Sequence, residues 1–547
     1  MASTNDIRIV AAIDFGCTYS GFACAHKDSP EEIYVQDYDE GNLETPTVLK
    51  YDKDFNVISW GLQALAGRTI RTKKNPADEL KPVELFKLHL GNMEEKPYLP
   101  EGLDYKKAIT DYLHEIGKTM KTYLSDKYKQ LEFFDQVIII LTIPAEFDNN
   151  AITILRQCAF EAGLTDAKNS RNLKFTTEPE AAAVHCMKLL SGNEIKQGDS
   201  FMIVDCGGGT VDLTTRQLLA GYTLGEITER TGDFCGSSYV DKEFIKFLER
   251  KVGKSTIENL RNNHYHQLQY LIQEFCRRIK LPFTGDGDTE VFEIDIQELC
   301  PVLKQYCKGP EHEIMEESEW IIELTFEDVK EMFDPIVARI VRLIRGQLSS
   351  NNSCTAIILV GGFSESKYLQ KRIKQEFSPQ VNNISVPIHP MLAVVKGAVQ
   401  FGIKEHVITS RILKWTYGTD IVRKWEPDDP LSRKLPNDMV KAFHALVEKG
   451  TQLTSKDKYT TTFKPSSLFQ KKLSFNMYIT SKLDAKYCDD DDDDVRLLNR
   501  WEIDIPVLDD FDDQMISFTL NFSTIEVIAT AINQKTKDEY QVTFNYE

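Results

Sequence analysis

Two stretches of the chain share a pattern of apolar residues, a turn and a second strand-like run. In the first, residues 8–14 are mostly apolar, residues 15–20 are rich in small and hydroxyl side chains, and residues 21–25 resume the apolar run. Residues 200–216 repeat this pattern around the turn Cys206–Thr210. Apolar runs of this length on either side of a turn predict two β-hairpins. We therefore expect a duplicated core with one hairpin in each half.

Strands and helices alternate after each hairpin. The pattern predicts a buried strand at Phe134–Thr142, helices at Asn149–Gly163, Glu180–Leu190 and Asp328–Leu348, and a strand at Thr355–Val360. The first of these helices carries apolar or small side chains at helical spacing and ends at a glycine, which is a common stop signal. Strands that alternate with helices argue for α/β layers.

The pattern changes near residue 405. Several stretches beyond that point alternate apolar and polar residues with a period of two, which indicates strands with one buried face. No long helical pattern follows them, so residues 405–547 are expected to form an all-β, sandwich-like domain. The predicted strands are Leu473–Ile479, Trp501–Pro506, Met515–Phe522, Glu526–Ile532 and Tyr540–Tyr546.

Length and composition indicate a folded protein of more than one domain. A chain of 547 residues is too long for one core, because single cores stop growing beyond roughly 250–300 residues. Hydrophobic residues make up 41% and charged residues 27% of the chain, an ordinary balance for a globular protein. The longest apolar run, Val137–Ile143, is too short to cross a bilayer. The eleven cysteines form no Cys-x-x-Cys pair, and no signal peptide is apparent, so we expect reduced thiols and a cytoplasmic or nuclear location.

Charge limits the range of partners. The net charge of −19 argues against a nucleic-acid partner, and no membrane partner is expected, although one nucleotide can still bind at a local site. The acidic run Asp489–Asp494 is expected to be a solvated loop. A calcium site is the alternative, but the run lacks the spaced acids, central glycine and final glutamate of the best-known calcium loop.

The second predicted turn has the composition of a phosphate-binding loop. Gly207–Gly209 leave no side chain and permit positive φ, so backbone N–H groups can close around phosphate oxygens. A flexible hairpin turn is the alternative. Asp14 and Asp205 each end an apolar strand, where a carboxylate is costly unless a partner compensates it. Mg²⁺ and its waters would do so, whereas the simpler interpretation is that each Asp caps its own turn.

Two common nucleotide motifs are missing from the sequence. No Gly-x-x-x-x-Gly-Lys-[Ser/Thr] occurs anywhere in the chain, and no Gly-x-Gly-x-x-Gly follows the predicted strands. These absences argue against a P-loop NTPase and against a Rossmann dinucleotide site. The phosphates would therefore be held by the hairpin turns and not by a helix N-terminus.

Six motifs, which follow one another along the chain as they do in the family, resemble those of the 70-kDa heat-shock protein (DnaK-type) family of the actin-like ATPase superfamily. They span residues 8 to about 404, and the divergence is most similar to the heat shock 70 kDa protein 12 branch of that family. The first two resemble phosphate signatures, the next two the connecting strand and a glutamate-bearing loop, and the last two the adenosine signature and final helix. The motifs are Ile13–Ser20, Phe201–Leu213, Thr142–Phe147, Thr177–Ala183, Leu359–Ser366 and Lys396–Gln400.

The resemblance implies a fold and an activity. The fold is a duplicated actin-like (ribonuclease H-like) ATPase domain at residues 1–404, with lobes at roughly 1–190 and 191–404, followed by a β-rich peptide-binding domain at 405–547 without the helical lid. The implied activity is slow hydrolysis of Mg²⁺-bound ATP to ADP and phosphate. Closure of the lobes would be coupled to the β domain, which would bind extended polypeptide clients, with co-chaperones as further partners.

The resemblance also implies roles for individual residues. Asp14 and Asp205 would hold Mg²⁺ through water, Glu178 would orient the attacking water, and Lys87 would support in-line attack on the γ-phosphate. The alternative for Lys87 is a surface lysine. Further positions implied to contact the nucleotide are Gly16, Cys17, Thr18, Tyr19, Gly207, Gly208, Gly209, Thr210, Gly236, Glu274, Arg277, Arg278, Gly361, Gly362 and Phe363. Thr18 and Thr210 would hydrogen-bond phosphates. An arginine of the Glu274–Arg278 group would stack on adenine, with a solvated charged helix as the alternative.

Several positions depart from the family's pattern. Cys17 replaces a threonine beside the γ-phosphate, so slower hydrolysis is expected. Met391 and Leu392 stand where the family has acids, and Glu365 where it has an arginine, so purine affinity is expected to differ. Cys17 and Cys206 flank the phosphate site. Their oxidation is one interpretation, and the preferred interpretation is that both are small buried residues.

The C-terminal region resembles the family's peptide-binding domain only loosely. Phe443–Thr451 resembles a strand and a Lys-Gly-Thr turn near its start, whereas His406–Leu413 is shorter than the usual linker and carries an arginine. Two rival functions therefore stay open. One is a nucleotide-dependent binding or scaffold module with little turnover, and the other is a small-molecule kinase of the same superfamily.

Overall fold

The structure is a computed structural model of the 547-residue chain. It describes the chain outside residues 1–6, 39–40, 66–80, 92, 94–95, 191–194, 288–290, 351–352, 405, 455–456, 464–471, 489–493, 505–514, 522–527, 535–536, 541–542 and 546–547. Most of the predicted acidic loop at Asp489–Asp494 lies outside the described residues. In the described part, no helix is long and apolar enough to cross a membrane.

The first predicted hairpin opens a mixed sheet. Strands β1 (Ile9–Phe15) and β2 (Tyr19–His26) are antiparallel, with Asp14 opposite Gly21. On its other side β1 pairs in parallel with β8 (Val137–Ile143), which pairs in parallel with β9 (Leu173–Thr177). The short strands β3 (Tyr34–Val35) and β4 (Thr45–Pro46) both pair with β2.

The second predicted hairpin opens a sheet of the same layout. Strands β10 (Ser200–Cys206) and β11 (Val211–Leu219) are antiparallel, with Asp205 opposite Asp212. Strand β10 pairs in parallel with β16 (Cys354–Val360), and β16 with β17 (Asn383–Ser385). The arrangement of hairpin plus two parallel strands thus occurs twice, as the repeated sequence pattern predicts, in a mixed α/β fold with several sheets.

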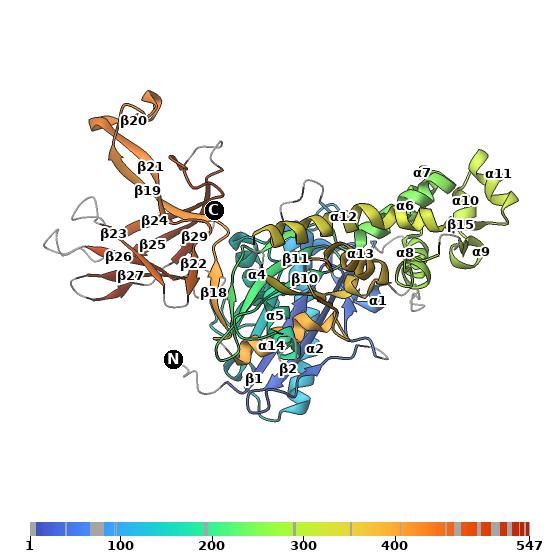
Figure 1. Cartoon of the computed structure of the whole chain (residues 1–547), viewed down its shortest axis with the longest axis horizontal. Helices are drawn as coiled ribbons and strands as arrows, with labels where there is room; N and C mark the ends of the chain where they lie inside the picture. The colour runs from blue at the N-terminus through green and yellow to red at the C-terminus, as the bar shows by residue number, and fades with distance from the viewer. Residues whose placement is uncertain are drawn as a thin grey trace. The chain divides into compact units, whose positions relative to one another are not determined.

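Two helices pack closely between these sheets. Helix α5 (Glu178–Leu190) contacts β10 and β11, and α14 (Leu392–Ile403) contacts β1 and β8 as well as α5 (Figure 1). A Cβ added at Gly397 of α14 would lie 1.8 Å from the carbonyl oxygen of Ala181. Only glycine permits this approach of the two backbones, so the first turn of α5 is held tightly against α14.

The remaining helices of this region cover the sheets. Helix α2 (Tyr105–Lys127) packs on α4 (Asn149–Glu161), and α12 (Phe326–Ser350) packs on α6 (Ser238–Val252) and α13 (Lys367–Phe377). Helices α4 and α12 begin and end within two residues of the predicted bounds, Asn149–Gly163 and Asp328–Leu348. Helix α5 begins two residues earlier than predicted, at Glu178.

One predicted strand begins too early. Residues Phe133–Gln136 form the short helix α3, and the strand starts at Val137. The reason is a difference in burial: every residue of Val137–Ile143 is buried, whereas Phe134 is 40% exposed and lies with Phe133 beneath the Lys121 ammonium. The apolar side chains of these two phenylalanines cover a surface lysine and do not extend the buried strand.

A helical region follows β13 (Thr231–Asp233). It contains α7 (Lys254–Asn263) and α8 (Tyr265–Phe275), and α8 continues into the π-helical turn η3 (Cys276–Lys280). Beyond them, β14 (Val291–Asp295) pairs with β15 (Ile321–Thr325) around the short helices α9 (Ile296–Leu299), α10 (Leu303–Tyr306) and α11 (Pro310–Glu317).

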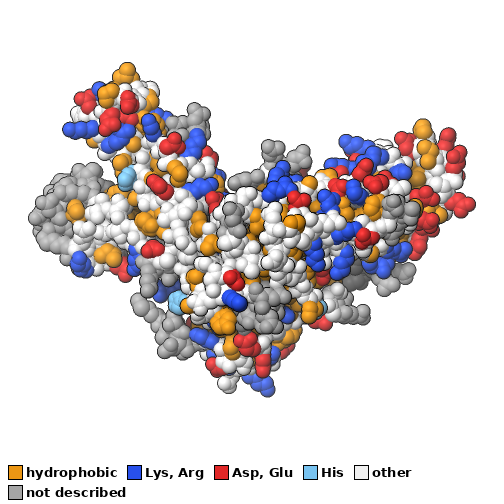
Figure 2. Space-filling model, viewed as in Figure 1, with side chains coloured by type: hydrophobic (Ala, Val, Ile, Leu, Met, Phe, Trp, Pro, Cys, Tyr) orange, Lys and Arg blue, Asp and Glu red, His pale blue; other side chains and the backbone are white. Residues whose placement is uncertain are grey.

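Much of the negative charge lies in this last part. Residues 291–328 contain eleven Asp and Glu but only two Lys, and acidic side chains gather there at the end that carries α9–α11 (Figure 2). About half of the chain's net charge of −19 is thus outside the predicted nucleotide site.

The chain divides into two compact units. The first comprises Met1–Tyr222 and Thr231–Val407, and the second Thr223–Arg230 and Ile408–Glu547. In the second unit, β12 (Thr223–Glu226) pairs in parallel with β18 (Ile408–Ile412), which pairs with β22 (Gln452–Thr454).

The second unit also contains two antiparallel sheets. One has the order β20-β21-β19-β24-β25-β29 and the other β23-β26-β27-β28. Phe475 of the first sheet stacks on Phe518 of the second, with ring centroids 4.9 Å apart. The strands are β19 (Thr416–Lys424), β20 (Lys434–Leu435), β21 (Met439–Val447), β23 (Lys458–Phe463), β24 (Lys472–Thr480), β25 (Arg496–Asp504), β26 (Ile516–Asn521), β27 (Ile528–Asn533), β28 (Glu539–Tyr540) and β29 (Thr543–Asn545).

The last predicted strand is wrong as a single element. The residues predicted as Tyr540–Tyr546 divide between β28 and β29, which belong to different sheets. A run of alternating residues does not show where a chain crosses from one sheet to the other, so the sequence pattern merged the two short strands.

Candidate functional site

The two hairpin turns of the first unit lie against each other. A Cβ added at Gly208 would lie 2.0 Å from Thr18 Oγ1, and one added at Gly209 would lie 2.9 Å from Cys17 Cβ. None of Gly207–Gly209 has the positive φ that the sequence analysis allowed for. Gly208 and Gly209 are therefore required by the close approach of the two turns and not by backbone conformation.

The start of helix α6 orients the glycine turn. The N–H groups of Gly236, Ser237 and Ser238 donate to the carbonyl oxygens of Gly209, Gly207 and Gly208 at 3.2, 3.0 and 2.9 Å. A Cβ at Gly236 would lie 2.5 Å from the carbonyl of Gly208. Within the described residues, the N–H groups of Gly208 and Gly209 have no acceptor. They are donors that an anion would satisfy.

Two hydroxyl groups that the sequence analysis missed hold the first turn. Ser20 Oγ accepts the N–H of Gly16 at 3.2 Å and shares a hydrogen bond of 2.7 Å with Thr47 Oγ1. Thr47 Oγ1 donates to the carbonyl oxygen of Gly16 at 2.9 Å, and the Thr47 N–H donates to that of Thr18 at 2.8 Å. The loop around Thr47 therefore fixes the conformation of residues 16–18.

Four carboxyl groups gather beside the turns, of which three are buried and that of Asp14 is half-buried. Asp14 lies near the end of β1, Glu178 begins α5, Asp205 lies near the end of β10, and Asp212 lies near the start of β11. Asp14 accepts a hydrogen bond of 2.7 Å from Thr142 Oγ1, and Asp212 accepts one of 2.8 Å from the N–H of Ala145. Each acid is thus placed by a different element.

Burial dominates the protonation of this cluster. It raises the pKa of Asp14 to about 7, and the negative charge of Glu178 adds to the effect. The pKa of Asp212 is raised to about 7 by burial, by Glu178 and by Glu146. Burial also raises the pKa of Asp205, with Glu178, Asp212 and Asp14 contributing. The acids therefore interact as one group, and the protein alone does not compensate their charge.

Lys87 is a fully buried member of the same cluster. Its Nζ lies 2.6 Å from Glu178 Oε1, and its ammonium lies 5.4 and 5.7 Å from the ring centroids of Phe15 and Phe147. The side chain is 0% exposed, so the alternative of a surface lysine is wrong. Burial by itself lowers the pKa of Lys87, but Glu178, Cys17 and Asp14 outweigh it and the pKa is raised.

The cluster fits a hard divalent cation. Four carboxyl groups and one ammonium leave an excess of negative charge when all are ionised, and oxygen donors are those that Mg²⁺ prefers. In the described part of the chain, no group of three or more His, Cys, Asp or Glu is arranged to hold a metal directly. Mg²⁺ usually keeps several waters and is bound by one or two carboxylates together with substrate phosphates.

The residues predicted for the nucleoside form a second cluster. Glu274 accepts from Arg277 Nη2 at 2.7 Å and pairs with Arg278 Nε at 2.5 Å, at the point where α8 passes into a π-helical turn. Such turns frequently occur at functional sites. The side chains of Arg277 and Arg278 are 67% and 47% exposed. Both alternatives therefore stay open, stacking on adenine and a solvated charged helix.

Lys280 and Gly361 link this cluster to the phosphate turns. Lys280 Nζ donates to the Ser237 carbonyl at 2.7 Å and lies 5.9 Å from the Phe363 ring centroid. Gly361 has φ 79°, and a Cβ there would lie 2.4 Å from Asp205 Oδ1. A Cβ at Gly362 would meet nothing within 4 Å. Tyr19, also predicted to contact the nucleotide, is 52% exposed.

Sequence reasoning missed two further acids. Asp212 lies within the second phosphate motif, and the sequence assigns it no role. The register of a hairpin with a four-residue turn places it opposite Asp205, and this register could have identified it. Glu44 precedes β4, and burial, Asp14 and Glu365 raise its pKa to about 8. No sequence pattern marks Glu44, because its neighbours in space are distant in the chain.

The two cysteines beside the turns are buried. Burial raises the pKa of the Cys17 thiol to about 12 and raises that of Cys206 as well. A thiol that remains protonated is a poor target for oxidation, which supports the preferred interpretation of small buried residues.

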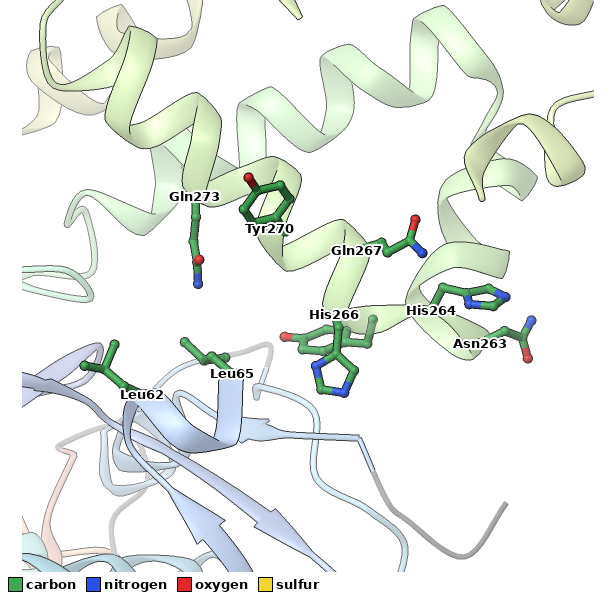
Figure 3. A pocket seen from close by; sticks show the side chains of 9 residues that line it. Leu62, Leu65, Asn263, His264, His266, Gln267, Tyr270 and Gln273 are labelled. Carbon is green, nitrogen blue, oxygen red and sulfur yellow. The ribbon is translucent and has the colours of Figure 1, made fainter. Parts of the chain in front are cut away.

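A separate pocket of about 580 Å³ lies between helix α1 (Leu62–Leu65) and the α7–α8 region (Figure 3). Leu62 and Leu65 approach it from one side and His266 and Gln273 from the other. None of the residues predicted for the nucleotide lines it. Its lining consists of Leu62, Leu65, Asn263, His264, Tyr265, His266, Gln267, Tyr270 and Gln273.

Comparison with known proteins agrees with the motifs. No family model matches the chain. It is 26% identical to heat shock 70 kDa protein 12A of Homo sapiens over 79% of this chain and 74% of the relative. It is 25% identical to heat shock 70 kDa protein 12B of Homo sapiens, over 88% and 82% of the two chains. Identity to protein 12A of Mus musculus is 25%, over 79% and 74%.

The mixed α/β fold, with its repeated hairpin sheets, is consistent with an actin-like ATPase of the 70-kDa heat-shock type. The chain is a divergent relative of the heat shock 70 kDa proteins, close to their protein 12 branch.

Proposed function

We propose that this chain is a chaperone-like ATPase that binds Mg²⁺-ATP between two lobes and hydrolyses it slowly to ADP and phosphate. The observation that carries the proposal is the cluster of half-buried Asp14 with buried Glu178, Asp205 and Lys87 beside two touching hairpin turns. The nucleotide-binding domain is assigned to residues 1–404, with lobes at roughly 1–190 and 191–404.

The turns supply the phosphate contacts. We assign these contacts to the N–H groups of Gly208 and Gly209 and to the hydroxyls of Thr18 and Thr210. Hydrogen bonds from the start of α6 occupy the carbonyl oxygens of the glycine turn, so these carbonyls are not directed at the phosphates. Asp14 and Asp205 would hold Mg²⁺. The ion, when bound, offsets the charge of the phosphates and of the carboxylates whose pKa values burial raises.

Glu178 and Lys87 act on the transferring group. Oε1 of Glu178 is engaged by Lys87, and in the described structure its other oxygen accepts no hydrogen bond, so that oxygen orients the attacking water. The water oxygen forms a bond to the γ-phosphorus as the bond to the bridging oxygen breaks. ADP leaves, and the water's proton ends on the product phosphate. Lys87 stabilises the charge that spreads over the transferring oxygens.

The β-rich region is proposed to bind an extended apolar polypeptide client. Residues 405–547 are assigned as a β-sandwich, because two antiparallel sheets share the aromatic contact between Phe475 and Phe518. Strands with exposed backbone groups and side-chain pockets recognise extended peptides in this way. Displacement of a labelled apolar peptide from the full chain by unlabelled peptides tests this part, and a lack of saturable binding would contradict it.

A second function is favoured by Cys17. This residue places a buried thiol at the turn where the resemblance implies a threonine hydroxyl, so the chain would bind nucleotide as a switch ligand with little turnover. The two functions share the binding step and differ in the chemical step.

Calorimetric titration with ATP, with and without Mg²⁺, tests the shared binding step. We expect saturable, Mg²⁺-dependent binding by the wild type. Asp205→Asn should weaken it by at least about tenfold, the effect of a lost charged hydrogen bond. Asp54→Asn, which removes an exposed carboxylate outside the cluster, serves as the control and should bind normally. Wild-type protein that binds no nucleotide would contradict both functions.

A further inference from the structure

A second buried ion pair lies close to the candidate site. Arg216 Nη2 is 3.0 Å from Glu180 Oε1, and both side chains are 0% exposed. Arg216 Nε also donates to Thr214 Oγ1 at 2.9 Å, so the guanidinium is fixed in two directions. Removing two ions from water costs several kcal/mol each, and an apolar pair of similar volume is often as stable. Stability alone is therefore a weak reason for this pair.

Glu180 belongs to the same helical turn as Glu178. The sequence Thr177-Glu-Pro-Glu180 has the form of a capping box, in which the glutamate returns to the N-cap backbone. One half of that box is the hydrogen bond that Thr177 Oγ1 accepts from the Glu180 N–H at 3.2 Å. The Glu180 carboxylate meets Arg216 and the hydroxyl of Thr176, the latter at 3.4 Å. Glu180 thus connects α5 to β11.

Strand β11 uses one face for all of these contacts. Asp212, Thr214 and Arg216 alternate along it and share a face. Asp212 accepts the N–H of Ala145 at 2.8 Å, and it is also the cross-strand partner of Asp205. The strand that carries Asp212 and pairs it with Asp205 of β10 therefore also holds, through Arg216, the turn that presents Glu178.

We propose that Glu180 and Arg216 are positioning residues whose ion pair fixes the first turn of α5 against β11, so that the Glu178 carboxylate is held beside Asp205 and Asp212. This inference rests on the proposed function for the role of Glu178 in hydrolysis. Its physical content, a clamp on residues 177–180, does not depend on turnover.

The test compares paired substitutions in the full chain. Glu180→Gln/Arg216→Met removes the pair without leaving one buried charge. Arg216→Lys keeps the charge but lacks the planar fork. Asp429→Asn/Arg423→Met is the control, since it removes an arginine–carboxylate pair, with two hydrogen bonds of 2.7 Å, in the other unit. Urea unfolding first establishes conditions under which every variant is folded.

Two readouts then separate positioning from stability. Without nucleotide, hydrogen exchange of the peptide covering residues 173–190 should accelerate by about tenfold or more in the double variant, because a local opening becomes easier. At saturating ATP the single-turnover rate should fall by about 10- to 100-fold with affinity changed less than about threefold, the effect of a small misplacement. Arg216→Lys should be intermediate in both, and the control pair should change neither.

Each outcome decides a different point. Exchange and turnover at wild-type values, with only the urea midpoint lowered, would overturn the inference and leave a purely structural ion pair. A wild type without turnover would contradict the hydrolytic part of the proposed function, and the exchange readout would still decide the clamp. Faster exchange in the control pair to the same degree would also overturn the inference, because the effect would then be general.

Discussion

Gly208 offers the sharpest test of how the two hairpin turns fit together. A Cβ at this position would lie 2.0 Å from Thr18 Oγ1 and 2.6 Å from its Cγ2. Because non-bonded carbons require about 3.5 Å or more, Gly208→Ala forces the turns apart by about 1 Å. Overpacking of this kind costs about 1–3 kcal/mol of stability.

The effect on nucleotide binding should exceed the effect on folding. Turns displaced by this amount no longer present the N–H groups of Gly208 and Gly209 to the same phosphate, and each lost hydrogen bond to a charged group costs about 1.5–3 kcal/mol. We expect ATP affinity to fall by about 10- to 100-fold, measured by calorimetry under conditions where urea unfolding shows a fully folded variant.

Gly346→Ala is the matched control for this prediction. Gly346 lies within helix α12, and a Cβ there would meet nothing within 4 Å. Alanine in a helix interior is favoured over glycine by about 0.5–1 kcal/mol, so this variant should be slightly more stable and bind ATP normally. If Gly208→Ala bound ATP with wild-type affinity, the reasoning that the turns form the phosphate site would be refuted.

Three further predictions concern protonation, metal and turnover. The pKa of Glu44 is raised from 4.5 to about 8, so its contribution to stability is complete below pH 4.5 and is lost as the pH rises toward 8. Glu44→Gln should therefore reduce the fall in the wild type's free energy of unfolding between pH 5 and 8 by about 1–3 kcal/mol, measured by urea unfolding. Parallel stability curves for the two proteins would contradict this prediction. Mg²⁺ with ADP should raise the melting temperature more at pH 8 than at pH 6, because it favours the ionised forms of Asp14 and Asp205; equal shifts would argue against a carboxylate-held ion. Cys17→Thr should speed single-turnover hydrolysis by restoring a hydroxyl, and an unchanged rate would show that Cys17 does not limit turnover.

Much of the first unit was predictable because its signals are local. The hairpins follow from apolar runs that stop at a glycine turn, and α4 follows from apolar and small residues at helical spacing. The short helix at Phe133–Gln136 and the division of residues 540–546 between two sheets depend on what those side chains pack against.

The candidate site divides in the same way. Asp14, Asp205 and the glycine turn lie within continuous motifs, so the sequence marks them. Ser20 and Thr47 act on the first hairpin turn, and Glu44 acts on Asp14, only because a loop folds back onto β2. The burial of Lys87 is equally invisible in the sequence, since its neighbours Phe15, Phe147 and Glu178 are brought together by three separate elements.

Single-turnover hydrolysis of γ-labelled ATP by wild type, Lys87→Ala and Lys121→Ala tests the central claim most directly. Lys121 is a matched control, because its ammonium also lies over two aromatic rings, Phe133 and Phe134, and donates to a carbonyl, that of Gly163. The proposed function predicts slow hydrolysis by the wild type and by Lys121→Ala, and a loss of about 100-fold or more in Lys87→Ala with ATP still bound. Hydrolysis by Lys87→Ala at the wild-type rate would contradict the proposed role of the buried cluster.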